Sequence, residues 1–497
     1  MSIEKLLWEE DATSLAARIR AKEITSTELT EAAIAWAERV NPDINAIAER
    51  LYDRARAKAK SADTASPFAG VPFVVKDLDI LMNGVPSHSG SRIAAYVPDI
   101  NSVLADRQEA AGLVPILTAT TPEFGLRLVT ESKAFGVTRN PWNIAHVTGG
   151  SSGGPAAMVS AGVVPIAHAG DGGGSIRVPA ACCGLVGLKP SRGRIPLSPH
   201  ASETWFGLVV THAVTRSVRD SAALLDATHG PDSLAPYAAR VPKGSFAQAA
   251  ARDPGRLKIG VWRDSPLGLP VSTETMAALD TAAALARDGG HELETIRLDF
   301  IGRDFLADFA LVVSCAMAGL FRKEAIRAGR SVIGEAERGT RIIARYGELR
   351  SGGELYAALD RLSATARRII AETAQYDAVL TPLIAHPPLA CGAMDPKGAD
   401  EWTEELLDRL RLTRLLALKP LFGELMDKSL WFTPWPAVQN VTGQPAIALP
   451  IYMTEAGLPL GVQAVGRPGD EETLLSLAAQ MEKQSGWLGR RAPLMRP

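Results

Sequence analysis

The sequence predicts an α/β fold, because short apolar runs alternate with helical sequence along most of the chain. Glycine and proline are spread through the chain rather than gathered in one linker, and no repeat at a fixed period is present. At 497 residues, the chain could form a few average domains or one large one. Since no boundary stands out, we expect residues 1–497 to form a single domain.

The individual elements follow from local patterns. Apolar residues recur at helical spacing over residues 14–37, which predicts a helical lead-in with Thr25 or Ser26 capping its second helix. Residues 71–75 form an apolar run typical of a buried strand, and residues 110–117 indicate a helix end followed by a strand.

The second half of the chain continues this alternation. Apolar runs predict further strands at residues 257–261, 378–380 and 446–450. Residues 304–430 are more helical and more charged, which predicts a helical elaboration that covers the substrate side of the core. Residues 65–195 contain the motifs described below and form the expected functional core.

Composition excludes several classes of partner. The 53 Lys and Arg residues nearly balance the 55 Asp and Glu residues, for a formal charge of −2. This balance predicts no nucleic-acid partner and no binding to an anionic membrane. The four cysteines form no Cys-x-x-Cys pair and the eight histidines show no metal-ligand spacing, so we expect no metal and no cofactor.

The same features predict a soluble, cytoplasmic protein. Adjacent Cys182 and Cys183 are poorly placed to bridge one another, as in a reducing compartment. Acidic residues fall within residues 1–11, where a secretion signal would continue its apolar core. The longest apolar stretch, residues 156–169, is too short to span a bilayer and is interrupted by Gly162 and Pro165.

Two serine-bearing glycine loops are the most informative feature of the sequence. Residues 149–154 read Gly-Gly-Ser-Ser-Gly-Gly, and residues 171–177 read Asp-Gly-Gly-Gly-Ser-Ile-Arg. Glycine lets backbones approach closely, so the loops can bring hydroxyls and amide N–H groups to one point. Ser175 precedes a short helix that Gly184 ends, and the amides around it form a nest suited to an oxyanion.

Lys76 closes the apolar run at residues 71–75, at the strand edge where α/β folds gather ligands. A lysine in this place is usually solvated, and it can act as a base only when it is uncharged, which requires burial. Together with the serine loops, it suggests a serine nucleophile that is activated without histidine.

These motifs resemble the amidase signature family over nearly the whole chain. The family's glycine-serine stretch is similar to residues 149–157, and its second loop is similar to residues 171–180. Its lysine block is similar to Gly-Val-Pro-Phe-Val-Val-Lys-Asp at residues 70–77. Residues 440–446 and 457–463, near the C-terminus, are also similar to the family.

The resemblance implies a central mixed, twisted sheet that helices cover on both faces, and it implies a role for each motif residue. Ser175 would be the nucleophile, Ser151 the bridging serine in a cis peptide, and Lys76 the base. The amides of Gly172, Gly173, Gly174 and Ser175 would form the oxyanion hole. Ser152 would add a hydrogen bond, while Asp171 and Arg177 would be structural and pair across the loop.

The resemblance further implies an amidase that cleaves a C–N bond through an acyl-enzyme, with a small-molecule amide as substrate, no cofactor and a homodimeric state. This chain has Gly170-Asp171-Gly172 where the family often has Thr-Asp-Thr or Thr-Asp-Ile, which predicts a roomier acyl pocket.

Within the family, residues 171–175 and 314–318 are similar to the branch that contains the 6-aminohexanoate cyclic-dimer hydrolases. Cys315 would then line the substrate pocket, although a cysteine in a helix is often a small buried hydrophobe. Five aromatic residues would either line an apolar cleft or belong to the core: Trp205, Phe206, Trp431, Phe432 and Trp435. Such a cleft would suit a bulky or aryl amide, a nylon-type oligomer or a carbamate.

Two other functions remain open on the sequence. Gly-Gly-Ser-Ser-Gly at residues 149–153 also fits the nucleophile elbow of α/β-hydrolases, which would make Ser151 the nucleophile of an esterase with a histidine and an acid. The motifs also fit the amidase subunit of a tRNA-dependent glutamine amidotransferase, which relays ammonia to a partner. The sequence shows no evident basic segment that would bind RNA, so charge does not support this second alternative.

Overall fold

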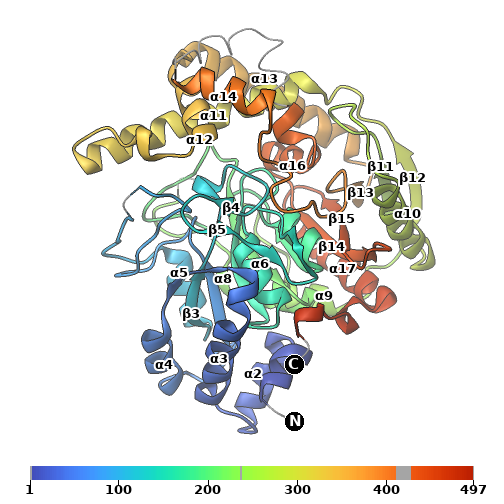
Figure 1. Cartoon of the computed structure of the whole chain (residues 1–497). Helices are drawn as coiled ribbons and strands as arrows, with labels where there is room; N and C mark the ends of the chain where they lie inside the picture. The colour runs from blue at the N-terminus through green and yellow to red at the C-terminus, as the bar shows by residue number, and fades with distance from the viewer. Residues whose placement is uncertain (1–2, 94, 236–237, 410–426, 496–497) are drawn as a thin grey trace.

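A mixed sheet forms the centre of the protein (Figure 1). In the computed structural model, which describes residues 3–93, 95–235, 238–409 and 427–495, this sheet has eleven strands. Their order is β1 (Ile47–Arg50), β3 (Val114–Ala119), β2 (Pro72–Lys76), β8 (Ile166–Asp171), β10 (Val210–Thr215), β9 (Val186–Lys189), β14 (Ala446–Met453), β15 (Pro459–Gly466), β13 (Ala378–Pro382), β11 (Lys258–Trp262) and β12 (Glu292–Ile296).

The sheet combines parallel and antiparallel pairs. Strand β2 runs parallel to β3 and β8, and β11 runs parallel to β12 and β13. The remaining neighbours pair antiparallel. Two two-stranded ribbons lie outside it, namely β4 (Glu131–Ser132) with β5 (Gly136–Val137) and β6 (Arg139–Asn140) with β7 (Asn143–Val147). The predicted α/β class with a mixed sheet is confirmed.

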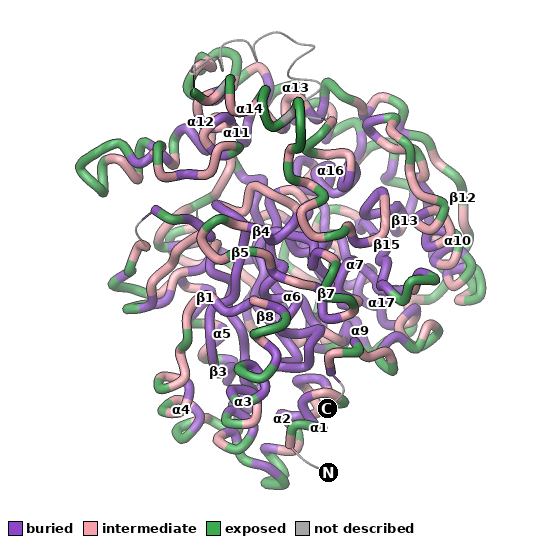
Figure 2. Tube along the Cα trace, viewed as in Figure 1, coloured by how far each residue is buried: buried purple, intermediate pink, exposed green. Residues whose placement is uncertain are grey.

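Helices cover both faces of the sheet, as predicted, and the strands form the buried centre of the molecule (Figure 2). Every residue of β2, β3, β8, β9, β10 and β13 is buried. The flanking helices include α4 (Tyr52–Lys60), α5 (Val103–Ala110), α6 (Gly153–Ser160), α7 (Arg177–Cys183), α8 (Val218–Thr228), α9 (Phe246–Ala251), α10 (Thr273–Asp288), α16 (Ala437–Thr442) and α17 (Glu471–Ser485).

The predicted helical lead-in consists of α1 (Ile3–Glu9), α2 (Ala12–Arg20) and α3 (Ser26–Ile44). Thr25, rather than Ser26, is the N-cap of α3. Its side chain accepts a hydrogen bond from the Glu28 amide while the Glu28 carboxylate accepts one from the Thr25 amide. This reciprocal capping satisfies amide groups that the first turn of a helix leaves without partners.

The predicted helical elaboration holds α11 (Arg303–Ala328), α12 (Arg338–Glu348), α13 (Gly352–Thr373) and α14 (Ala399–Arg409), which gather at one end of the molecule (Figure 1). Helices α11, α12 and α13 pack around a second cluster of buried apolar side chains, and α14 packs against α12. The stretch 304–430 also contains β13, a strand of the central sheet, and its residues 410–426 lie outside the described residues. Among the described helices, α11 is long and apolar enough to span a membrane, but 56% of its apolar window is buried inside the fold.

The two ends of the chain lie side by side, at the end of the molecule away from α11 (Figure 1). The Arg491 guanidinium donates a hydrogen bond to the Glu9 carbonyl oxygen at 3.2 Å. Arg216, from the segment between β10 and α8, donates a hydrogen bond to the Trp8 carbonyl oxygen at 2.8 Å. These contacts join the two ends to each other and to the segment that follows β10.

Candidate active site

Lys76 is the last residue of β2, and its side chain is 1% exposed. Its Nζ donates a hydrogen bond to Ser151 Oγ at 3.0 Å. The parallel neighbours of β2 end at the same edge of the sheet, so residues that follow β3 and β8 come close to this amine. The lysine is therefore buried and directly linked to the first glycine loop.

The first glycine loop is pressed against neighbouring backbone. Its Gly150–Ser151 peptide bond is cis, as the family resemblance implied. A Cβ at Gly150 would lie 2.7 Å from the Val129 nitrogen, and one at Gly153 would collide with the hydroxyls of Thr130 and Thr148. Only glycine fits these positions, because atoms of real side chains do not approach so closely.

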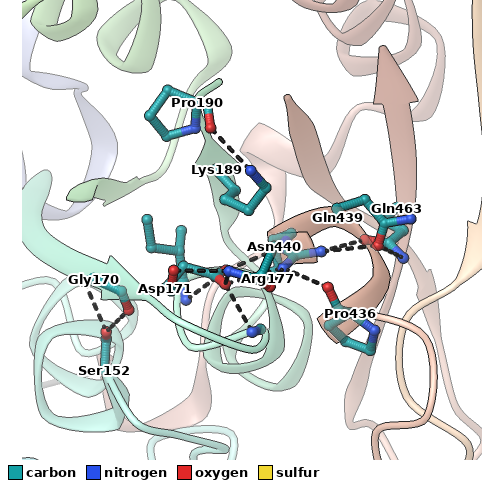
Figure 3. A network of polar contacts seen from close by, with 12 residues as sticks. Ser152, Gly170, Asp171, Arg177, Lys189, Pro190, Pro436, Gln439, Asn440 and Gln463 are labelled. Carbon is teal, nitrogen blue, oxygen red and sulfur yellow. Dashed lines mark hydrogen bonds and ion pairs between the residues drawn. The ribbon is translucent and has the colours of Figure 1, made fainter. Parts of the chain in front are cut away.

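Ser152 connects the first glycine loop to Ser175 of the second loop and to Gly170, which precedes that loop on β8 (Figure 3). Its amide donates a hydrogen bond to the Ser175 carbonyl oxygen at 3.2 Å. Its hydroxyl oxygen lies 3.2 Å from the Gly170 carbonyl oxygen and 3.3 Å from the Gly170 nitrogen, so it can donate to the first and accept from the second. These contacts fix the distance between the loop that carries Ser151 and the loop that carries Ser175.

A buried ion pair shapes the second glycine loop (Figure 3). Arg177 Nε donates to Asp171 Oδ2 at 2.9 Å, and both side chains are 0% exposed. Burial alone would raise the pKa of Asp171, but the Arg177 guanidinium outweighs it and holds that pKa well below its usual range. The remaining guanidinium donors reach Pro436, Gln439, Asn440 and Gln463.

The Asp171 carboxylate also accepts hydrogen bonds from backbone amides of this loop. Gly174 N–H donates to Asp171 Oδ1 at 2.7 Å, and Ile176 N–H donates to Asp171 Oδ2 at 3.1 Å. The amide of Gly174 is therefore engaged with Asp171 in this structure. Among the described residues, the amides of Gly172, Gly173 and Ser175 donate no hydrogen bond to another protein group.

The second loop leads into α7, which begins at Arg177 and ends at Gly184 in the left-handed conformation, with φ +72°. This is the short, glycine-terminated helix that the sequence predicts. Gly174 has φ +127°, a backbone conformation that favours glycine.

A cavity of about 560 Å³ opens above these groups, and Lys76, Ser151 and Ser175 all line it. Its wall is largely apolar, with Ile93, Phe124, Trp205, Val209, Met317 and Leu320, and charged side chains line another part, namely Glu203, Lys323, Glu324 and Arg327. Among the described residues, no hydrogen bond joins the Ser175 hydroxyl to that of Ser151. The structure thus places the three predicted catalytic residues in one cavity and links two of them directly.

The two predicted pocket residues both line this cavity. Phe206 is 41% exposed, and Cys315 lies on α11 with its thiol directed to the Gly347 carbonyl oxygen at 3.9 Å. Burial raises the pKa of Cys315, so its thiol stays protonated at neutral pH. Of the other aromatic candidates, Trp205 lines the cavity, whereas Phe432 and Trp435 are fully buried in the two hydrophobic clusters.

Other side chains lie against Gly170 and Gly172, and the roomier acyl pocket stays a prediction. A Cβ at Gly170 would collide with the Asp79 carboxylate, and one at Gly172 would lie 2.9 Å from the Trp205 ring. The Asp79 carboxylate is a site residue that the sequence analysis missed. Its Oδ2 accepts a hydrogen bond from Lys76 Nζ at 3.0 Å.

A family model described as Amidase matches residues 28–475 of this sequence. The chain belongs to the amidase signature family. Members of this family are hydrolases that act on amide bonds, so the predicted enzyme class is confirmed.

Among the similar proteins is a 6-aminohexanoate-cyclic-dimer hydrolase of Pseudomonas sp. (strain NK87), 36% identical, with 99% of this chain and 98% of that protein covered. A solved structure of a 6-aminohexanoate cyclic dimer hydrolase superposes with a TM-score of 0.91, at 34% identity and 99% coverage of both chains. A bacterial aryl acylamidase superposes with a TM-score of 0.85, at 25% identity and 99% coverage of both chains. The predicted similarity to the cyclic-dimer hydrolase branch is confirmed.

Proposed function

We propose that this amidase cleaves a C–N amide bond with Ser175 as nucleophile, Ser151 as proton relay and Lys76 as base. The observation that carries the proposal is the hydrogen bond of 3.0 Å between Lys76 Nζ and Ser151 Oγ, in the cavity that Ser175 also lines. A nucleophile, a relay and a buried amine in one cavity are the groups that acyl transfer requires.

The proposed proton path starts from an uncharged Lys76. The amine takes the Ser151 proton while Ser151 takes the Ser175 proton, and the Ser175 oxygen attacks the amide carbonyl carbon. As the tetrahedral intermediate collapses, the proton returns through Ser151 to the leaving nitrogen, which departs as an amine. Water then attacks the Ser175 ester by the same path and releases the acid.

The proposed oxyanion hole consists of the amides of Gly172, Gly173 and Ser175. Removing one such donor typically costs about 3–4 kcal/mol of transition-state stabilisation. Asp171 supports the hole indirectly, because it binds the amides of Gly174 and Ile176 and so fixes the curvature of the loop.

We further propose that the substrate is a bulky, largely apolar amide of the size of a nylon-type oligomer, an aryl amide or a carbamate. The cavity of about 560 Å³ has room for such a compound, and its wall is largely apolar. The similar proteins are named for the hydrolysis of a cyclic 6-aminohexanoate dimer and of aryl acylamides. Cys315 and Phe206 would contact the substrate in this cavity.

The experiment that tests this function is an assay of the purified chain on a panel of cyclic and linear 6-aminohexanoate oligomers, anilides, esters and carbamates. Amide hydrolysis without a partner protein or glutamine supports the proposal, and a dependence on either supports the amidotransferase alternative. Labelling with a serine-directed phosphonate then identifies the nucleophile. An adduct on Ser175 is expected, whereas one on Ser151 would support the esterase alternative.

Two broader features also remain proposals. We expect a homodimer in solution and a cytoplasmic location for a soluble enzyme. Cys182 and Cys183 are free and buried, which agrees with a reducing compartment.

A further inference from the structure

Asp79 lies beside the proposed base in a conformation that few residues adopt. Its backbone φ is +71°, in the left-handed region. Its side chain is 14% exposed, lines the cavity and accepts a hydrogen bond from Lys76 Nζ at 3.0 Å. A backbone conformation of this kind is retained where the surrounding structure holds it, and here it directs a carboxylate at the amine.

The chain leaves space for this carboxylate at one particular position. Gly170, on β8, faces Asp79 so closely that a Cβ would collide with the Asp79 Oδ2 atom. The glycine is therefore needed for the contact between Asp79 and Lys76, and any larger residue at position 170 would push the carboxylate away.

The other groups around Lys76 do not replace this negative charge. Ser151 is a neutral acceptor. Burial, followed by the charges of Lys76 and His212, lowers the pKa of His168 well below its usual value, so His168 is uncharged. The neighbouring Asp77 is occupied elsewhere, since its carboxylate accepts the amides of His88 and Gly90.

We propose that Asp79 is a positioning residue for Lys76, whose carboxylate holds Nζ against Ser151 and stabilises the ammonium form. This inference rests on the proposed function, in which Lys76 must lose its proton before it can accept one from Ser151. Without Asp79, the amine loses this contact and the opposite charge that favours its ammonium form, so activity would extend to lower pH.

The test compares pH profiles of kcat/KM for the wild type and for Asp79→Asn. Asparagine tolerates a positive φ and keeps the size of the side chain, so the substitution removes the charge with little change in shape. We expect the acid limb to move to lower pH, as for the loss of an opposite charge in direct contact. The plateau at high pH falls because Nζ is less well held, so the two profiles cross.

Asp280→Asn is the matched control, since Asp280 also pairs with a basic side chain, Arg263, but does not line the cavity. Its acid limb should stay at the wild-type position. An unshifted limb in Asp79→Asn, or one that moves to higher pH, would overturn the proposal.

A second pair of variants tests the contact with Gly170. Gly170→Ala should displace the Asp79 carboxylate and move the acid limb in the same direction as Asp79→Asn. In the background of Asp79→Gly, which keeps the backbone conformation but has no carboxylate, Gly170→Ala should cause no further shift. Additive shifts would show that the two positions act independently and would contradict the inference.

The proposed function and this inference can fail separately. If Lys76→Ala keeps wild-type kcat/KM at every pH, Lys76 is not the base and the proposed function fails. If Lys76→Ala is inactive but the acid limb of Asp79→Asn does not move, only the role of Asp79 is wrong. Circular dichroism and urea unfolding of each variant show whether it is folded, because the phosphonate labels only an activated Ser175 and would miss a folded but inactive variant.

Discussion

Arg177 Nε lies 2.9 Å from Asp171 Oδ2, and neither side chain has any exposed surface. The pair fastens α7 to the end of β8, and the same carboxylate binds two amides of the loop that carries Ser175. The geometry of the proposed oxyanion hole thus depends on a charge pair that the substrate does not touch.

Asp171→Asn leaves the Arg177 guanidinium buried without its counter-charge. We expect a loss of about 3–5 kcal/mol in the free energy of unfolding, and a lower kcat for the molecules that remain folded. The matched control is Glu471→Gln, which breaks the buried pair of Arg194 with Glu471 away from the cavity. Urea unfolding should show a loss of stability in both variants, whereas kcat per titrated site should fall only in Asp171→Asn.

Gly172→Ala would place a Cβ 2.9 Å from the Trp205 ring and 3.0 Å from Val209. The loop must shift to relieve this contact, and a misplaced catalytic group typically costs about 100-fold in rate. We expect kcat to fall by about 10- to 100-fold, with a smaller change in KM. Gly339→Ala, on α12 with open space around its Cα, should leave kcat unchanged.

Cys315 provides a probe of the cavity. Because burial raises the pKa of its thiol, we expect slow alkylation by iodoacetamide at pH 7.5 and faster alkylation as the pH rises. Alkylation should abolish amide hydrolysis, and bound substrate should protect against it. Cys315→Ala should remove this sensitivity, whereas Cys391→Ala should keep it, since Cys391 does not line the cavity. Full activity after stoichiometric alkylation of Cys315 would contradict its place in the substrate pocket.

Glu482, which does not line the cavity, predicts that the stability of the fold depends on pH. Burial, followed by the charges of Asp11 and Asp220, raises the pKa of Glu482 from 4.5 to about 7. The folded state then binds more protons than the unfolded state between about pH 4.5 and 7, so stability falls as the pH rises through this window.

Glu482→Gln keeps an oxygen to accept the Val218 amide and removes this titration. Since the side chain is partly exposed, we expect the wild type to lose only about 1–2 kcal/mol relative to Glu482→Gln between pH 5 and pH 8. Urea unfolding at several pH values measures this difference. Parallel stability curves for the two proteins would exclude Glu482 as the titrating group.

The sequence predicted much of the site because its chemistry lies in local motifs. Lys76 follows an apolar strand, and Ser151 and Ser175 lie in loops whose glycines permit close backbone contact. Lys76 ends β2 and Ser175 follows β8, so the edge shared by these two parallel strands predicts that both residues lie close together. Ser151 follows a strand outside the central sheet, and packing of its loop places it beside them.

What the sequence did not predict depends on backbone conformation and on distant packing. Asp77 and Asp79 are both near to Lys76 in the chain, and only the positive φ of Asp79 directs its carboxylate to the amine. Likewise, Phe432 and Trp435 are large aromatic residues of the kind that line clefts, yet they are core residues. The hydrogen bond from the Gly174 amide to Asp171 was not predicted for the same reason, since this contact depends on the fold of the loop.

The hydrogen bond between Arg491 and Glu9 joins the two ends of the chain at the end of the molecule away from α11, which lines the cavity. A carrier protein or a solid support attached at either end should therefore leave the cavity mouth accessible to polymeric amides. The same closeness makes this enzyme a good subject for circular permutation, with a short peptide connecting the natural ends and new ends opened in a surface loop.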